Sequence, residues 1–126
     1  MYQKLATSGE LGLRVHVMVS ASEKTELTYW LKRGPLVDPS GQVNVRAIKV
    51  YADGALGSRG AALLEEYADD PGNFGLLLTE AERIQQVALQ GLNAGFQVCT
   101  HAIGDRANRL ALDAYEAAFE KFEKNA

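Results

Sequence analysis

Two short segments carry the residues whose types and spacing could perform chemistry. The first holds Lys49 and Asp53 and continues into a glycine-rich stretch, and the second begins at His101. Each lies where an apolar run, predicted as a strand, gives way to a loop, which is where α/β proteins place their active sites. A carboxylate or a modified lysine, together with an imidazole, can bind the divalent metal of a hydrolase. Such a metal lowers the pKa of a bound water and polarises a carbonyl group.

Each of these residues also has a purely structural interpretation. A histidine at the end of a strand is more often hydrogen-bonded than metal-bound, and Asp53-Gly54 is a common turn dipeptide. Asp105 is most simply the N-cap of a helix. The glycines of the 54–60 stretch could cradle a phosphate, but no Gly-Lys-Ser/Thr follows them. Lys49 is the hardest to explain structurally, because a lysine inside a buried strand requires a partner or a function.

The chain alternates between predicted strands and helices, so the fold class is α/β. This order implies parallel strands joined by right-handed crossovers. A capping box formed by Thr79 and Glu82 is expected to start the helix that ends at Gly95. The long loop before it, over 54–78, is expected to hold a short helix near 61–67. The predicted strands are 11–20, 43–52 and 96–100, and the other predicted helices are 2–8, 25–33 and 105–124.

The second predicted strand has two different faces, because side chains alternate along a strand. Its apolar face suits covering helices, and its polar face near the strand end is typical of a catalytic barrel strand. Lys49 lies deeper than Asp53 by about 13 Å along an ideal strand. The true end of this strand therefore decides which of the two meets His101. The apolar face comprises Ile48, Val50 and Ala52, and the polar face comprises Lys49, Tyr51 and Asp53.

Composition limits the classes of protein that the chain can represent. Its 126 residues are enough for one domain with a core, and 47% apolar with 23% charged residues is ordinary globular usage. A net charge of −3 with scattered basic residues argues against a nucleic-acid partner. No apolar run approaches the roughly 18 residues of a membrane span, and the N-terminus is too polar for a signal peptide. The single cysteine, Cys99, rules out an internal disulfide and favours a cytoplasmic location.

Three segments together resemble the amidohydrolase superfamily, in the YtcJ-like branch known as amidohydrolase family 3. Their order and spacing agree with that family, and the resemblance covers nearly the whole chain. It implies a metal-dependent hydrolase on a (β/α)8 barrel that cleaves C–N bonds in non-peptide amides and related compounds. The segments are IKVYADGALGSRGAAL over 48–63, YADDPGNFG over 67–75 and HAIGDRA over 101–107.

The same resemblance implies roles for individual residues. His101 matches the metal-binding histidine that ends the fifth barrel strand. Lys49 matches the fourth-strand lysine, which would bridge two metals if it were carboxylated, and zinc is the expected divalent metal. Asp53 is expected to take part in catalysis. The residues expected to contact the amide-type substrate are Arg59, Tyr51 and Asp105.

The chain also departs from the family's pattern. The family needs a His-x-His pair after the first barrel strand, a histidine after the sixth and an aspartate after the eighth, and residues 1–126 supply none of them. The chain is therefore expected to be an internal fragment of the barrel domain, covering about strands three to five and inactive in isolation. Its open sheet edges are expected to cause self-association. Two alternatives stay open: a non-catalytic α/β binding or regulatory module, and a phosphate-binding flavodoxin-like domain.

Overall fold

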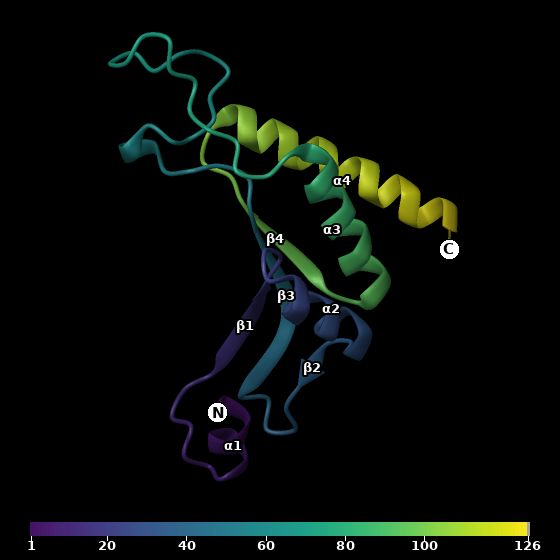
Figure 1. The fold of residues 1–126 in the computed structure, drawn as a ribbon. Helices are drawn as coiled ribbons and strands as arrows, with labels where there is room; N and C mark the ends of the chain where they lie inside the picture. Colours follow the sequence, from purple (N-terminus) through teal and green to yellow (C-terminus); the bar gives the residue numbers. More distant parts are fainter. Residues whose placement is uncertain (126) are drawn as a thin grey trace.

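The computed structural model describes residues 1–125 and is built around one sheet. Its central strand is β3 (Val43–Tyr51), which pairs in parallel with β1 (Val15–Ser20) and with β4 (Gln97–His101). A two-residue strand, β2 (Leu36–Val37), pairs antiparallel with the first part of β3. The sheet thus combines parallel and antiparallel pairs, with β3 in the middle (Figure 1). The predicted parallel α/β arrangement is confirmed for the three longer strands, whereas β2 was not predicted.

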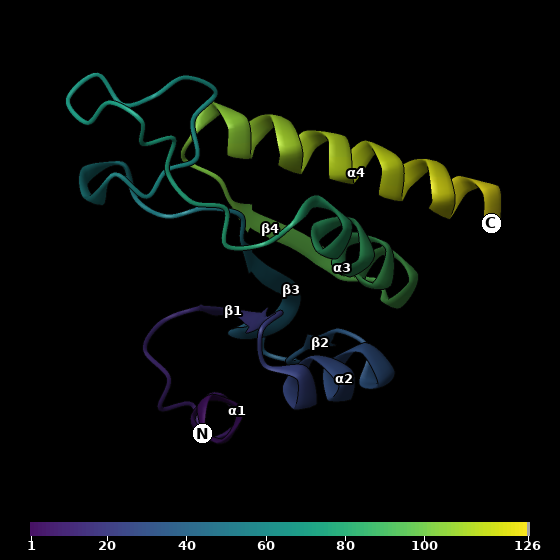
Figure 2. The same cartoon turned by 45° about the horizontal axis from the view of Figure 1, so that its top comes forward.

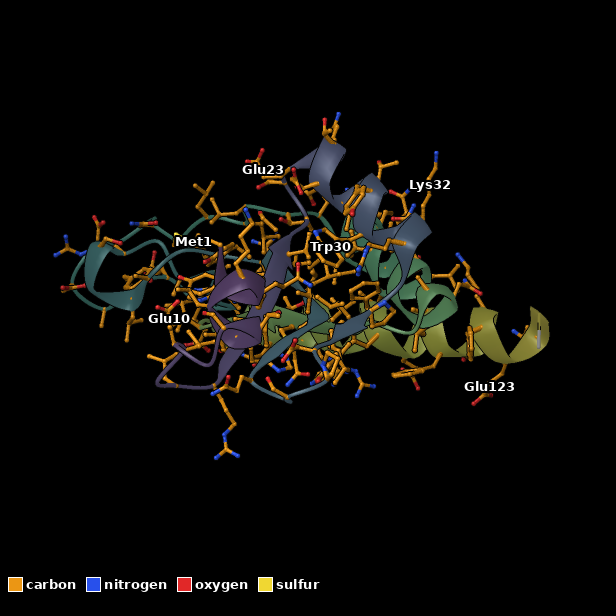
Figure 3. All side chains as sticks on the ribbon, turned by 90° about the horizontal axis from the view of Figure 1, so that it is seen from below. Met1, Glu10, Glu23, Trp30, Lys32 and Glu123 are labelled. Carbon is orange, nitrogen blue, oxygen red and sulfur yellow. The ribbon has the colours of Figure 1, made fainter. Side chains whose placement is uncertain are left out.

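The three longer helices pack against the sheet. α3 (Ala81–Ala94) and α4 (Asp105–Asn125) run side by side next to β4, and α2 (Lys24–Arg33) lies beside β1 and α3 (Figures 1 and 2). The short helix α1 (Tyr2–Thr7) sits below the sheet near the start of β3. None of the helices within residues 1–125 has the length and hydrophobicity that a bilayer crossing requires. The charged side chains of Glu23, Lys32 and Glu123 lie on the outside (Figure 3).

The core lies between the sheet and these helices. The apolar face predicted for the central strand is confirmed, because its side chains are almost fully buried. α3 ends at Gly95, which adopts the left-handed conformation that favours glycine at this position. The residues of this face in the core are Ile48 and Val50 of β3 and Ala52, which follows the strand, and their partners include Leu27 of α2, Ile84 and Val87 of α3, and Ala107 and Ala114 of α4.

The first strand begins later than predicted, at Val15 rather than at residue 11. Leu11 is buried in a separate small cluster with Ala6 and Val43, so its burial reflects packing under α1 and not a place in the sheet. The pairing of β1 with β3 also shifts register between Val17 and Met18. The helix predicted over 2–8 is confirmed within one residue at each end.

The short helix predicted over 61–67 is wrong. The backbone N–H of Leu63 donates to the carbonyl of Phe74, and that of Tyr67 donates to the carbonyl of Asn73, both at 2.9 Å. These groups are therefore bonded across the loop and cannot form the i→i−4 bonds of a helix. Alanine-rich sequence favoured a helix locally, but contacts made later in the chain decide the conformation.

The capping box predicted from Thr79 and Glu82 is also wrong. α3 begins at Ala81 with Glu80 as its N-cap, and no side chain caps this end. The hydroxyl of Thr79 instead donates to the carbonyl of Tyr51 at 2.7 Å. This bond ties the segment before α3 to the end of β3, so Thr79 helps to place the helix without capping it.

Candidate functional site

The carboxyl ends of β3 and β4 lie side by side and bring the predicted site residues together. Tyr51 is paired with His101 across the two strands, and their ring centroids are 5.4 Å apart. His101 Nε2 lies 3.7 Å from Asp53 Oδ1 and 3.5 Å from the carbonyl oxygen of Gly54. Because β3 ends at Tyr51, the chain turns there and carries Asp53 to the imidazole. Of the two residues that could meet His101, the structure therefore selects Asp53.

Lys49 lies on the face of the sheet that the helices leave uncovered, two residues before Tyr51. Its backbone is paired with Cys99 of β4, and its side chain is half-buried. Lys49 Nζ lies 4.4 Å from the centroid of the Tyr51 ring, close enough for a cation–π interaction. Across residues 1–125 no acidic side chain forms an ion pair with it. The aromatic ring is thus the partner that this lysine was expected to need.

Asp53 differs from the expectation that it shares the open face with Lys49 and Tyr51. Its side chain is buried, with 1% exposure, because strand alternation stops at the end of β3. The carboxylate accepts three backbone N–H bonds, and these come from the long loop and from the segment that follows β4. Ile103 donates to Oδ1 at 2.9 Å, and Gly104 and Ala62 donate to Oδ2 at 2.8 and 2.9 Å.

The long loop packs directly against backbone, and glycine makes this possible at two positions. A Cβ added at Gly104 would overlap the carbonyl oxygen of Ala62, and one added at Gly75 would overlap that of Ala61. Gly75 also has a φ of +76°, in the region that favours glycine. Sequence reasoning missed both contacts, since the partners lie far apart in the chain or within an irregular loop.

Arg59 fixes the outer part of the same loop. It follows the 3-10 turn η1 (Leu56–Ser58) and has a left-handed φ of 54°. Its Nη2 donates to Asp69 Oδ2 at 3.0 Å and its Nε donates to Asp69 Oδ1 at 3.3 Å, while Asp70 Oδ2 lies 3.8 Å from Nε. The hydrogen bonds with Asp69 raise the pKa of Arg59 and lower that of Asp69. In this structure Arg59 therefore binds its own loop.

We expect Arg59→Gln to return the pKa of the Asp69 carboxyl toward its ordinary value of 3.8, because the hydrogen bond from Arg59 holds it lower. The ion pair should accordingly contribute fully above that value and be lost as the pH falls through the lowered folded-state pKa. Carboxyl-detected NMR titration of Asp69 measures this change. Arg109→Gln, which removes the same charge from the surface of α4, is the matched control and should leave the Asp69 titration unchanged. Identical Asp69 titrations in the two proteins would contradict the expectation.

Asp105 is the first residue of α4, close to its predicted place as a helix N-cap. Its Oδ1 accepts the backbone N–H of Arg106 at 2.8 Å and that of Leu64 at 2.9 Å. The second bond attaches the long loop to α4, which the sequence did not indicate. The side chain that was expected to contact substrate therefore also holds the loop in place.

A divalent metal would find only part of a ligand set in this chain. Residues 1–125 contain no group of three or more His, Cys, Asp and Glu side chains able to hold a metal ion. A catalytic zinc site uses three protein ligands and a water. His101 has suitable donor chemistry and a partly exposed side chain, and Lys49 lies on the same open face, whereas Asp53 is occupied by backbone N–H groups. The described residues fit one side of a metal site and do not complete it.

The sequence is similar to curated proteins over most of its length. A family model described as "Amidohydrolase family" matches residues 1–126. The putative amidohydrolase YtcJ of Bacillus subtilis (strain 168) is 35% identical over 115 residues, which is 91% of this chain and 21% of the relative. Protein LONG AFTER FAR-RED 3 of Arabidopsis thaliana is 43% identical over 70 residues, which is 56% of this chain and 12% of the relative.

Solved structures agree with these relatives. An uncharacterised metal-dependent hydrolase from Pyrococcus furiosus superposes with a TM-score of 0.82 and 33% identity, over 92% of this chain and 24% of that chain. An uncharacterised metal-dependent hydrolase from Pyrococcus horikoshii OT3 superposes with a TM-score of 0.79 and 31% identity, over 90% of this chain and 23% of that chain. The chain thus spans between 12% and 24% of the length of these proteins. With a family model that matches along its whole length and a fold shared with metal-dependent hydrolases, the chain belongs to the amidohydrolase family.

Proposed function

We propose that residues 1–126 form part of a metal-dependent hydrolase that cleaves C–N bonds in non-peptide amides. The observation that carries the proposal is the meeting of His101 and Asp53 at the ends of adjacent parallel strands, in a chain of this family. His101 and Lys49 would hold the divalent metal, for which we propose zinc. The metal would supply an activated water and polarise the scissile carbonyl.

We further propose that the sheet is part of a (β/α)8 barrel, with β1, β3 and β4 as about barrel strands three to five. Residues 1–126 would then be one piece of a single barrel domain. Parallel strands joined through helices support this, as does the packing of α2, α3 and α4 against one face of the sheet. The opposite face carries the polar side chains that a barrel interior would present near its carboxyl end. Those side chains are Lys49, Tyr51 and His101.

Each remaining site residue has a proposed task that follows from its position. Asp53 faces the Nε2 side of the imidazole together with the Gly54 carbonyl, so it would act on the reaction through the orientation of His101. Tyr51, with 51% exposure beside that ring, is well placed to contact an amide substrate. Substrate contact by Arg59 and Asp105 would require side chains that already bind the long loop, Arg59 through Asp69 and Asp105 through the N–H of Leu64. Their role in binding stays a prediction.

Other properties predicted from the sequence also stay predictions. These are the cytoplasmic location, the lack of a nucleic-acid or membrane partner, and self-association of the chain. The strands β1 and β4 each pair with β3 alone among the strands within residues 1–125, so each has an open edge. Such edges are the places where a second chain can pair.

We expect the purified 126-residue chain to hydrolyse no amide at a measurable rate, because its described residues do not complete a ligand set. The assay follows amine release from a panel of simple amides, with zinc and again after chelation. His101→Ala is the matched control for metal-linked activity. Zinc-dependent turnover that disappears in this variant would contradict the expectation.

The hydrolase proposal has its own test in the reading frame around these residues. We expect a His-x-His pair upstream, and a histidine and an aspartate downstream, of the segment that encodes residues 1–126. The protein that includes them should show metal-dependent amide hydrolysis that His101→Ala removes. A reading frame without those residues would instead favour a non-catalytic α/β binding or regulatory module.

A further inference from the structure

A cavity of about 250 Å³ opens at the carboxyl ends of β1 and β3. Lys49 and Tyr51 of the candidate site form part of its wall, whereas Asp53 and His101 do not. We name it the Arg83 cavity, after the arginine that α3 contributes to it. Its polar lining includes Ser20, Ser22, Lys49 and Arg83, and its apolar lining includes Val50 and Val87.

Backbone contacts hold the polar side chains of the Arg83 cavity near one another. Ala21 donates its N–H to the carbonyl of Lys49 at 2.9 Å, and its own carbonyl accepts a bond from Arg83 Nη2 at 3.4 Å. The two residues that flank Ala21 are serines, and the Oγ atoms of Ser20 and Ser22 lie 2.8 Å apart. One short segment at the end of β1 therefore places two hydroxyl groups in the cavity that the lysine of β3 and the arginine of α3 also line.

The positive charges of this cavity have no acidic counterpart. Its walls contain Lys49 and Arg83 but no aspartate or glutamate. Neither cation forms an ion pair within residues 1–125. Arg83 Nη1 donates only to the amide oxygen of Gln86, at 2.8 Å, and Lys49 faces the ring of Tyr51. Partly buried cations favour an anionic partner, so this arrangement suits a bound anion while Lys49 holds no metal. With a metal on Lys49, Arg83 would remain as the cation of the cavity.

The position of Arg83 on its helix strengthens this conclusion. It is the third residue of α3, in the first turn, where the helix dipole favours anions and disfavours cations. The side chain does not stabilise the helix there, and instead adds to the positive potential of the cavity. A basic residue in the first turn of a helix was the signal that sequence reasoning could have used to find it.

We propose that the Arg83 cavity binds the carboxylate of a small organic anion. The forked donors of arginine match the two oxygens of a carboxylate, and the serine hydroxyls can donate to the same group. The exposed side chain of Leu78 provides an apolar wall for a short aliphatic chain, whereas Val50 and Val87 are buried. The cavity includes Lys49 and Tyr51 of the proposed catalytic site, so the anion would be a carboxylate group of the amide substrate itself. That substrate role rests on the proposed function, whereas anion binding itself does not.

The test is an NMR titration of the ¹⁵N-labelled 126-residue chain without metal and with a chelator present. Butyrate is the probe, and butyramide is its neutral analogue of the same shape. We expect saturable shifts with butyrate at the amides of Ala21 and Ser22 and at Arg83 Nε, and none with butyramide. Arg83→Gln should weaken butyrate binding about tenfold or more. Arg46→Gln, which removes the same charge from an exposed residue of β3, should change it less than about twofold.

Several outcomes would overturn the proposal. These are equal shifts with butyramide, shifts confined to other residues, or unchanged butyrate affinity in Arg83→Gln. Tighter binding of inorganic phosphate at equal ionic strength would overturn the carboxylate assignment. If Arg83→Gln fails to fold, Arg83→Lys serves instead, and its loss of the forked donors should still weaken binding about threefold; unchanged affinity there would also overturn the proposal. Neither metal nor turnover is needed, so failure here leaves the hydrolase proposal intact, and the reverse also holds.

Discussion

Replacing Asp53 with alanine is expected to lower the free energy of unfolding by about 3–5 kcal/mol. The carboxylate is buried and accepts the N–H groups of Ala62, Ile103 and Gly104. Alanine would leave all three donors without their partner, and each unsatisfied buried donor costs roughly 1–3 kcal/mol. The expected total lies below the largest sum of these costs, because a loop that is released can expose some of the donors to water.

Urea denaturation followed by far-UV circular dichroism at neutral pH measures the loss. Asp53→Asn should cost less, about 2 kcal/mol, because the amide keeps one acceptor oxygen and presents its NH₂ group to the remaining N–H. Asp113→Ala is the matched control, since that exposed carboxylate pairs with Arg109 on the surface of α4, and its effect should stay within about 0.5 kcal/mol. A loss below about 1 kcal/mol in Asp53→Ala would contradict the structural role.

The parts of the fold that follow local pattern could be predicted from the sequence. The alternation over 48–52 identified the buried face of β3, and helical spacing identified α2, α3 and α4. Gly95 marked the end of α3 because only a few residues adopt the left-handed conformation easily. In each case the residues that decide the structure lie within one or two turns of one another.

The conformation of the long loop could not be predicted from its local sequence, because the groups that bind its backbone N–H groups lie far away in the chain. The N–H of Leu64 is held by Asp105, and that of Ala62 is held by Asp53, which also binds the segment that follows β4. A local preference for helix over 61–67 amounts to a few tenths of a kcal/mol per residue, so bonds of this kind override it. The same reason explains why Thr79 bonds to the end of β3 and does not cap its own helix.

The candidate site was predictable in its location but not in its geometry. Parallel strands place their carboxyl ends together, so the proximity of Asp53 and His101 followed from the order of the elements. The burial of Asp53 did not follow, since it depends on Ala62 and Gly104, which lie 9 and 51 residues away. The order of the strands predicts that Asp53 and His101 meet, whereas tertiary contacts decide that the Asp53 carboxylate is buried against backbone N–H groups.

Gly104→Ala is expected to destabilise the chain by about 3–5 kcal/mol or to prevent its folding. The added Cβ would overlap the carbonyl oxygen of Ala62, which is backbone and cannot rotate away. Both residues also donate their N–H groups to the same oxygen of Asp53, so a shift that relieves the overlap would stretch one of these bonds. Overpacking alone costs about 1–3 kcal/mol, and each lost hydrogen bond to a charged group adds about 1.5–3 kcal/mol.

Gly57→Ala is the matched control for this substitution. A Cβ at Gly57 would meet nothing within 4 Å, and its φ is not in the left-handed region, so the change should lie within about 0.5 kcal/mol of zero. Denaturation gives the free energies, and hydrogen exchange at the Ala62 and Ile103 amides should become faster in Gly104→Ala only. A loss below about 1 kcal/mol would show that Ala62 can move freely, against the contact described.

The double variant Asp53→Ala, Gly104→Ala shows whether the two single substitutions lower the free energy of unfolding through the same structural change or through two independent ones. If both single changes release the same loop from the end of β4, the second should cost much less once the first is present. The expected coupling is about 1–3 kcal/mol, in the range measured for residues of one hydrogen-bond network. Additive losses would instead mean that the overlap at Ala62 and the bonds of Asp53 act on different parts of the chain. The loop would then not depend on the carboxylate that lies beside His101.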